Sequence, residues 1–352
     1  MRPRAGLGGL EQRVLARWRQ LPSRSSAAVV VGFSGGGDSL ALAAVLGRIA
    51  SLGNLSPILV HIDHGWRAVS GHEQREAAAL ASGLGLPFHA YRMPDEARAS
   101  HPGVGAEEAA RRERYRLLAA AARALGTDLI ALAHHQDDQA ETVLLHLLRG
   151  AGLAGAAGMR EVRRMAIPWW EVGPEEANLL LWRPFLSEPR SVIRAYAAAT
   201  GLTPLVDPSN DDPAFRRNLL RAEAMPLLER IAPGATPALV RFAALAAADD
   251  ETLHATAAAV LPDAVTADGE LVRSRVMTRP PAVRRRLIRQ WVHLGHPIAL
   301  VTAERTEAML DLLERGEPGK RLEIGDGWSV EATRGGLRID RVPAAERRID
   351  PR

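Results

Sequence analysis

The sequence predicts an α/β protein in which helices cover both faces of a parallel sheet. Short apolar, β-branched runs alternate with helical segments over the first two-thirds of the 352-residue chain. These runs are largely apolar, as strands are when both faces of a sheet are buried. A glycine-rich turn follows the first run, and ligands of such sheets lie beyond the carboxyl ends of the strands. We expect a helical linker and a small α+β domain to follow the sheet.

The first part of the chain contains four expected pairs of strand and helix. The run "AAVVVGF" stands directly before the glycine-rich turn, and a segment of helical composition follows the turn. The second expected helix ends in glycine, which is a common helix stop signal. The strands are expected at 27–33, 57–63, 87–93 and 128–135, and the helices at 40–52, 71–85, 105–126 and 137–150.

The pattern changes after Gly150. Residues 151–159 are expected to form a loop of small residues. Residues 179–202 are expected to form a strand, a proline turn and a helix whose N-cap is Ser187 or Ser191.

The remainder of the chain is expected to be helical first and then mixed. Residues 206–234 combine a turn, which Asp207 and Asn210 can fold through their own side chains, with a basic helix. A long helix is expected from about residue 235, and residues 320–341 alternate polar and apolar side chains around glycines, as short hairpins do. We therefore predict a catalytic domain at 1–230, a helical linker at 231–262 and a C-terminal domain at 263–352.

Composition narrows the functional classes. The chain is 47% hydrophobic and 24% charged, as folded domains are, and no apolar run reaches the roughly 18 residues that a membrane span needs. The first residues also lack the apolar core of a signal peptide, so we expect a cytoplasmic protein with no membrane partner. The absence of cysteine excludes disulfides, thiolate zinc sites and iron–sulfur clusters within this chain. The net charge of +4 permits a nucleic-acid partner without establishing one.

The stretch "SGGGDS" is a candidate nucleotide-binding loop. It leaves an apolar strand and enters a helix, so its backbone N–H groups can converge on a phosphate at the helix N-terminus. It lacks the lysine that the common phosphate loop directs at outer phosphates, which favours a ligand held by its pyrophosphate. An acidic side chain beside phosphate is favourable if Mg²⁺ lies between them, which makes Asp38 the candidate magnesium ligand. The alternative is a glycine-rich turn that binds nothing. The candidate ATP-binding residues are Ser34, Gly35, Gly36, Gly37, Asp38 and Ser39.

The stretch "AHHQDDQAET" places two carboxylates on the first turn of a helix. Asp138 and Glu141 stand three residues apart and share one face, where they can bind a cationic amine or accept its proton. These acids can instead complement the charge of the helix N-terminus. A transition-metal site is disfavoured because adjacent side chains on a strand point to opposite faces. The two sets of ligands weighed for such a site are His134, His135, Asp137 and Asp138, or His61, Asp63 and His64.

These motifs resemble a known family. The loop is similar to the PP-loop, S-G-G-x-D-S, of the N-type ATP pyrophosphatases, which have an adenine nucleotide alpha hydrolase-like fold and split ATP into AMP and pyrophosphate. The resemblance narrows to the tRNA(Ile)-lysidine synthetases, is close over about residues 27–230, and is loose beyond them. The stretches that carry it are "VHIDHGWR" (60–67), "ARRERYRLL" (110–118), the block at 133–159, "RPFL" (183–186) and "DPSNDDPAFRRNLLR" (207–221).

The resemblance implies a ligase reaction on tRNA. ATP and Mg²⁺ adenylate O2 of the wobble cytidine in the CAU anticodon of tRNA(Ile), with release of pyrophosphate. Free L-lysine then attacks C2 and expels AMP, which gives lysidine and switches decoding from AUG to AUA. The implied catalytic residues are Asp38, Arg114, His134, Asp138 and Glu141, with Asp38 also serving Mg²⁺ through the nucleotide.

Several basic residues are candidate contacts of the tRNA. Arg111 and Arg114 share one helical face, which either holds phosphate or cytidine or is a solvated basic surface. The same two readings apply to the later basic residues, because a phosphate track and a charged surface look alike in sequence. The candidate tRNA-binding residues are Arg111, Arg149, Arg217, Asn218 and Arg221. The C-terminal domain, with "RRRLIRQW" at 284–291, is expected to recognise the tRNA body, and a homodimer is compatible with the sequence.

Three other functions share part of this pattern. A tRNA thiolation enzyme has the same loop but usually needs cysteines, which this chain lacks. A small-molecule adenylating synthetase does not need the RNA-directed blocks. A noncatalytic ATP-dependent RNA-binding protein does not need the acidic residues of the two motifs. The pair Trp169 and Trp170 is expected in core or loop packing rather than in an interface or a base-stacking surface.

Overall fold

The structure, a computed structural model, describes residues 7–22, 26–63, 70–94, 100–101, 105–165, 179–206, 216–296, 301–325 and 327–341. The expectations for His64, Trp169, Trp170, Asp207 and Asn210 lie outside the described residues. The described chain forms two compact units, one with residues up to 145, 158–165 and 179–241, the other with 146–157 and the residues from 242 onward. The three domains expected at 1–230, 231–262 and 263–352 stay a prediction.

The first unit is built on a mixed, mostly parallel sheet. Within the described residues it has six strands in the order β3-β2-β1-β4-β6-β5. Neighbouring strands are parallel except at one edge, where β5 runs antiparallel to β6. The predicted parallel α/β sheet is therefore confirmed, with an added edge strand that was not predicted. The strands are β1 (Ala28–Gly32), β2 (Ser56–Asp63), β3 (Phe88–Arg92), β4 (Leu129–Ala131), β5 (Val162–Arg164) and β6 (Leu180–Trp182).

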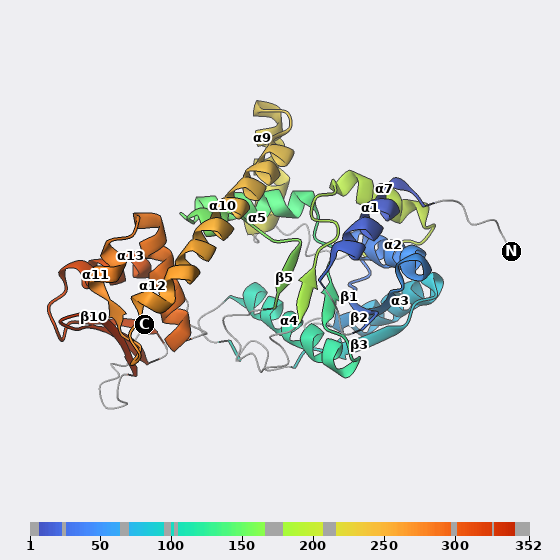
Figure 1. The fold of residues 1–352 in the computed structure, drawn as a ribbon. Helices are drawn as coiled ribbons and strands as arrows, with labels where there is room; N and C mark the ends of the chain where they lie inside the picture. Colours follow the sequence, from blue (N-terminus) through green and yellow to red (C-terminus); the bar gives the residue numbers. More distant parts are fainter. Residues whose placement is uncertain are drawn as a thin grey trace. The chain divides into compact units, whose positions relative to one another are not determined.

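Helices cover both faces of this sheet (Figure 1). Val29 and Val31 of β1 pack into one large core with apolar residues of α1, α2, α3 and α7. The helix α4 packs against β1, β2 and β4 on the other face, where Leu118 lies close to Gly32. The helices are α1 (Gly9–Gln20), α2 (Gly37–Gly53), α3 (Ser70–Leu84), α4 (Ala106–Ala124), α5 (Gln136–Leu148) and α7 (Arg190–Ala199).

The start of α7 differs from the prediction. The N-cap is Pro189, so the expected N-cap at Ser187 or Ser191 is wrong. The backbone N–H of Arg190 donates instead to Asp137 Oδ2 of α5 at 3.0 Å. The hydroxyl of Ser187 accepts a hydrogen bond from Arg17 of α1. A carboxylate from a distant helix therefore replaces the local cap and ties the starts of α5 and α7 together.

The basic helix expected within 206–234 is present as a continuous helical segment with a π-helical turn in it. It consists of α8 (Arg216–Leu219), a π-helical turn η4 (Leu220–Ala224) and α9 (Met225–Ile231). Leu220 and Met225 pack against Ala140 of α5, which fixes this segment beside the strand ends. The long helix α10 (Ala235–Ala264) follows, as predicted.

The second unit contains a small antiparallel sheet with helices, as the α+β prediction required. Its strands in the described chain are ordered β7-β10-β9-β8, and the hairpins predicted around the late glycines are present. Trp291 and Met309 lie in its core. The elements are α6 (Leu153–Ala156), β7 (Leu271–Val272), α11 (Arg273–Met277), α12 (Pro281–Gly295), α13 (Ala303–Arg315), β8 (Arg321–Gly325), β9 (Trp328–Ala332) and β10 (Gly336–Arg341).

No single helix among the described ranges is long and apolar enough to cross a membrane. One sharply bent pair, Arg216–Ile231 with Ala235–Ala264, meets the requirement by length and composition alone.

Candidate active site

The glycine-rich loop joins β1 to α2 at the carboxyl end of the sheet. The Oγ atoms of Ser34 and Ser39 lie 3.2 Å apart, so the two predicted hydroxyls converge. The N-cap of α2 is Gly36, and no described side chain caps this helix. The N–H groups of its first turn are therefore left for an anion, which the positive end of the helix attracts.

Gly35 gives this loop its shape. Its φ is +81°, a left-handed conformation that side-chain-bearing residues avoid. A Cβ atom at this position would lie 2.5 Å from Leu205 Cδ1. The carbonyl of Gly35 accepts a hydrogen bond from the Leu205 N–H at 3.0 Å. The segment before residue 207 thus closes on the loop so tightly that only glycine fits.

Asp38 presents an unpaired carboxylate oxygen at this loop. Its Oδ2 lies 3.6 Å from His135 Nε2, whereas the buried Oδ1 has no hydrogen-bond partner in the described part of the chain. Burial alone raises the pKa of Asp38, but the nearby imidazole of His135 and its charge outweigh burial and lower it. The charges of Arg190 and Arg194 lower the pKa of Asp38 further, so the group is an ionised carboxylate.

This arrangement fits a magnesium ion held with a nucleotide. Mg²⁺ prefers oxygen ligands and is usually bound by one or two carboxylates together with substrate phosphates. The free Oδ1 of Asp38 is such a ligand. Among the described residues, no group of three or more His, Asp or Glu side chains is arranged to hold a metal. His64 of the second set lies outside the described residues, and the two transition-metal sets weighed from the sequence stay untested.

The second acidic group lies at the start of α5. Asp138 Oδ2 accepts the backbone N–H of His135 at 3.0 Å, and Oδ1 accepts Nη2 of both Arg217 and Arg221 at 3.1 Å. Glu141 Oε2 accepts Arg217 Nε at 2.9 Å, and Oε1 accepts Arg221 Nε at 2.6 Å. The structure therefore brings Asp138 and Glu141 together on one face, and it gives both of them guanidinium partners.

His135 lies between the two acidic groups. It is buried, and its Nε2 is 3.6 Å from Asp38 Oδ2 and 3.4 Å from Asp138 Oδ2. Its Nδ1 is 3.7 Å from Asp137 Oδ2. From the sequence, His135 is considered only as a candidate metal ligand. Its place in a histidine pair at a strand end could have indicated a site residue, because adjacent side chains of a strand point to opposite faces and one of the two must turn towards the loop.

His134 lies among arginines instead. Its Nδ1 accepts a hydrogen bond from Arg183 Nε at 3.3 Å. Burial, followed by the charges of Arg183 and Arg217, lowers the pKa of His134 well below its ordinary value. The imidazole is therefore neutral and holds the guanidinium of the "RPFL" segment at the end of β6.

The start of α7 contributes two basic residues that the sequence did not indicate as site residues. The backbone of Arg190 is fixed by Asp137, and its buried Nε has no hydrogen-bond partner within the described ranges. Arg194 is exposed one helical turn later. Both charges act on Asp38. The spacing of these two arginines, four residues apart after a proline turn, could have indicated a shared helical face. The direction in which their side chains point depends on how α7 packs against α2.

The remaining predicted residues lie on α4, on α8 and in the second unit, and the charge of Arg111 helps to lower the pKa of His134. Arg111 of α4 is partly exposed, and its guanidinium group lies over the ring of Tyr115. Its Nε lies 3.6 Å from Oε2 of Glu108. Arg114 is exposed on the same helix. Asn218 is half-buried in α8. Arg149 is exposed and belongs to the second unit. The roles assigned to these four residues stay predictions.

Comparisons with known proteins identify the family of the chain. A PP-loop domain model matches residues 10–228, and a TilS substrate binding domain model matches residues 271–338. A tRNA(Ile)-lysidine synthase of Salinispora tropica is 39% identical over 330 residues, which cover 92% of this chain and 91% of that protein. One from Methylobacterium is 38% identical over 89% of this chain and 86% of its own, and one from Thermus thermophilus is 37% identical over 82% and 53%.

Among solved structures, a U34-tRNA thiolase from Methanococcus maripaludis is similar with a TM-score of 0.53. The match covers 67% of this chain and 78% of that one at 17% identity, and it shows a shared fold alone. The two domain models and the relatives that match over almost the whole chain identify the family. The chain belongs to the tRNA(Ile)-lysidine synthases of the PP-loop class.

Proposed function

We propose that this protein is an ATP-dependent ligase that joins L-lysine to C2 of the wobble cytidine in the CAU anticodon of tRNA(Ile). One observation carries the proposal. Asp38, which has a free oxygen at the nucleotide loop, and Asp138 both lie within 3.6 Å of Nε2 of the buried His135. Glu141 lies on the same helical face as Asp138 and shares its arginine partners. A site for a triphosphate thus adjoins a site for an amine, and the reaction needs both.

In the first step, O2 of the cytidine attacks the α-phosphorus of ATP. The new O–P bond forms as the bond to the β-phosphate oxygen breaks, and pyrophosphate leaves. The hydroxyls of Ser34 and Ser39 and the free N–H groups at the start of α2 stabilise the charge that grows on pyrophosphate. Asp38 would hold Mg²⁺, which when bound neutralises phosphate charge.

In the second step, the ε-amine of lysine attacks C2 of the adenylated cytidine, and AMP leaves with the O2 oxygen. The amine arrives as an ammonium ion, which Asp138 and Glu141 bind and whose proton one of them accepts. Neutral His134 fixes Arg183 beside this turn. Alignment of three reactants matters because it supplies up to about 7 to 11 kcal/mol of a barrier.

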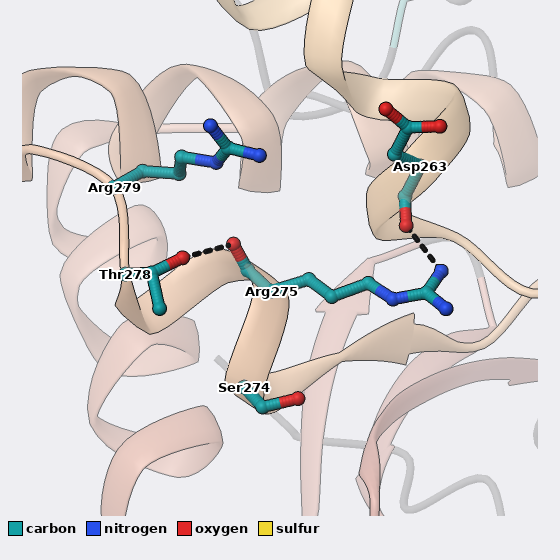
Figure 2. A pocket seen from close by; sticks show the side chains of 5 residues that line it. All are labelled: Asp263, Ser274, Arg275, Thr278 and Arg279. Atoms are coloured by element: carbon teal, nitrogen blue, oxygen red, sulfur yellow. Dashed lines mark hydrogen bonds between the residues drawn. The ribbon is translucent and has the colours of Figure 1, made fainter.

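The second unit supplies candidate tRNA contacts. Asp263, Ser274, Arg275, Thr278 and Arg279 line a hollow of about 460 Å³, and Figure 2 shows these five side chains. All of them except Asp263 lie within the part matched by the substrate binding domain. We propose that Arg279 meets an RNA phosphate there. The basic segment 284–291 is a weaker candidate than expected. Arg284 donates to backbone carbonyls, Arg285 pairs with Glu307 and Arg286 pairs with Asp250.

The alternative functions are not favoured. The relatives that match over most of the chain are lysidine synthases, and the thiolase is similar in fold alone. Free L-lysine as co-substrate rests on the sequence resemblance, and Mg²⁺ rests on the resemblance together with the free oxygen of Asp38. Action in the cytoplasm rests on the composition of the chain, and a homodimer is compatible with the sequence.

One experiment tests the proposal. The purified protein is incubated with ATP, Mg²⁺, labelled lysine and tRNA(Ile) transcripts that carry either CAU or a mutated anticodon. We expect label in the CAU transcript alone. An absence of label there, with protein shown to be folded, contradicts the proposed function, and label in both transcripts contradicts its anticodon specificity.

A further inference from the structure

The two carboxylates assigned to the lysine amine are already occupied. Arg217 and Arg221 together make hydrogen bonds to both oxygens of Glu141 and to Oδ1 of Asp138, all between 2.6 and 3.1 Å. Asp138 Oδ2 is taken by the N–H of His135. Every carboxylate oxygen of the pair thus has a donor, and an ammonium ion would have to displace one.

Charge and burial lead to the same result. Two carboxylates face two guanidinium groups, so a third cation is attracted less strongly than it would be by two unpaired carboxylates. Glu141 is 2% exposed, whereas the side chains of Arg217 and Arg221 are 34% and 27% exposed. The arginines therefore lie between the carboxylates and solvent. Burial alone lowers the pKa of Arg221, but the hydrogen bond and charge of Glu141 raise it overall, as in a well-formed ion pair.

The segment that carries these arginines permits their release. Arg217 lies in α8 and Arg221 in the π-helical turn, four residues apart on one face. The backbone is held separately, because Leu220 and Met225 pack against Ala140 in an apolar cluster. The guanidinium groups can exchange partners while this anchor stays in place. Phosphate is a suitable new partner, since guanidinium binds it in the same two-pronged geometry as carboxylate.

We propose that Arg217 and Arg221 keep the amine site closed until tRNA binds, and that tRNA phosphates then take the guanidinium groups and free Asp138 and Glu141 for the substrate ammonium. This inference rests on the proposed function and adds an order of binding to it. It also unites two roles that the sequence kept apart, because the same arginines contact the acidic pair and the RNA. An enzyme built in this way does not fill its amine site before the base to be modified is present.

The test measures L-lysine binding by equilibrium dialysis with labelled lysine and without ATP, so that no reaction occurs. In the wild type, tRNA(Ile) should strengthen lysine binding by roughly 5- to 150-fold, the usual range of coupling between sites. The variant Arg221→Gln should bind lysine at least about fivefold more tightly than wild type when tRNA is absent, and should gain less from tRNA. The control Arg230→Gln removes an exposed arginine of α9 and should behave as wild type.

A ligand control and a reciprocal binding measurement complete the test. L-norleucine, which lacks the ε-amine, should show no gain in Arg221→Gln, because the freed carboxylates recognise the ammonium. If Arg221→Gln does not fold, the wild type alone decides, since lysine must strengthen tRNA binding by the same factor by which tRNA strengthens lysine binding. Equal lysine affinity with and without tRNA, or no gain in a folded Arg221→Gln, overturns the inference. Lysine incorporation by the wild type in either case leaves the proposed function standing.

Discussion

The glycine-rich loop and the start of α5 both present carboxylates at the end of the same sheet, but they differ in what is left unpaired. At the loop, Asp38 keeps a buried oxygen without a partner and the first turn of α2 lacks a side-chain cap. At α5, two arginines and the backbone N–H of His135 donate hydrogen bonds to every carboxylate oxygen of Asp138 and Glu141. On the proposed function, the nucleotide half of the site is open and the amine half is closed by ion pairs. We therefore propose that charge pairing controls the second step and not the first.

The largest expected effect comes from removing the open carboxylate. Asp38→Asn keeps the size of the side chain but loses its charge, so lysidine formation should fall roughly 10²- to 10³-fold. Binding of tRNA in a filter assay and the melting temperature should change little, because Asp38 holds no guanidinium group. A parallel loss of tRNA binding would contradict the division between chemistry and recognition.

The geometry of the open loop gives the next largest effect. Gly35→Ala places a Cβ against Leu205 in a left-handed backbone conformation. The contact should lower the free energy of unfolding by about 1–3 kcal/mol beyond the loss from backbone strain alone. The control is Gly85→Ala, where φ is +66° and a Cβ would meet nothing within 4 Å. Its cost should be only about 1 kcal/mol. Urea unfolding of both variants measures the difference, and equal costs would show that Leu205 does not press on the loop.

The closed half should respond in stability as well as in activity. Glu141→Gln leaves Arg217 and Arg221 with an uncharged partner, and should lower the free energy of unfolding by about 1–3 kcal/mol. Lysine incorporation should fall in the same variant. A double-mutant cycle with Arg221→Gln measures the coupling. If the losses of unfolding free energy in the two single variants add up to the loss in the double variant, the ion pair between Glu141 and Arg221 contributes nothing to stability. The contrast between this pair and the unpaired Asp38 would then be wrong.

The smallest effect concerns the neutral histidine beside the amine half. Because the pKa of His134 is lowered in the folded state, its stabilising contribution is present above about pH 6.5, the ordinary value, and is lost as the pH falls below it. His134→Asn keeps an acceptor for Arg183 but does not titrate. Its melting temperature should therefore depend less on pH between about 7 and 5 than that of the wild type. Parallel curves would show that His134 is charged or exposed.

The sequence predicted the parts of this site that are local. The run before "SGGGDS" and the spacing of Asp138 and Glu141 follow from strand and helix periodicity, and the structure has both where expected. The helix at Gly9–Gln20, the antiparallel strand β5 and the cap of α7 by Asp137 were not predicted. The cap joins residues 53 positions apart, which no local pattern reports.

The partners of the carboxylates show the same limit. Arg217 and Glu141 are 76 positions apart, and an arginine run looks the same whether it faces solvent, RNA or an acid. Only the packing of Leu220 and Met225 on α5 decides the direction of these side chains. The periodicity therefore located the charged groups, and tertiary packing determined how they pair.

The short antiparallel strand at the end of the sheet has a consequence for the chain before it is fully folded. Parallel sheets form slowly, and an open strand edge is a template on which other chains can aggregate. Here β5 is three residues long and ends in Arg163 and Arg164, and the opposite edge strand, β3, carries exposed His89 and Arg92. Both edges of the described sheet therefore carry polar side chains, which disfavour the addition of a foreign strand.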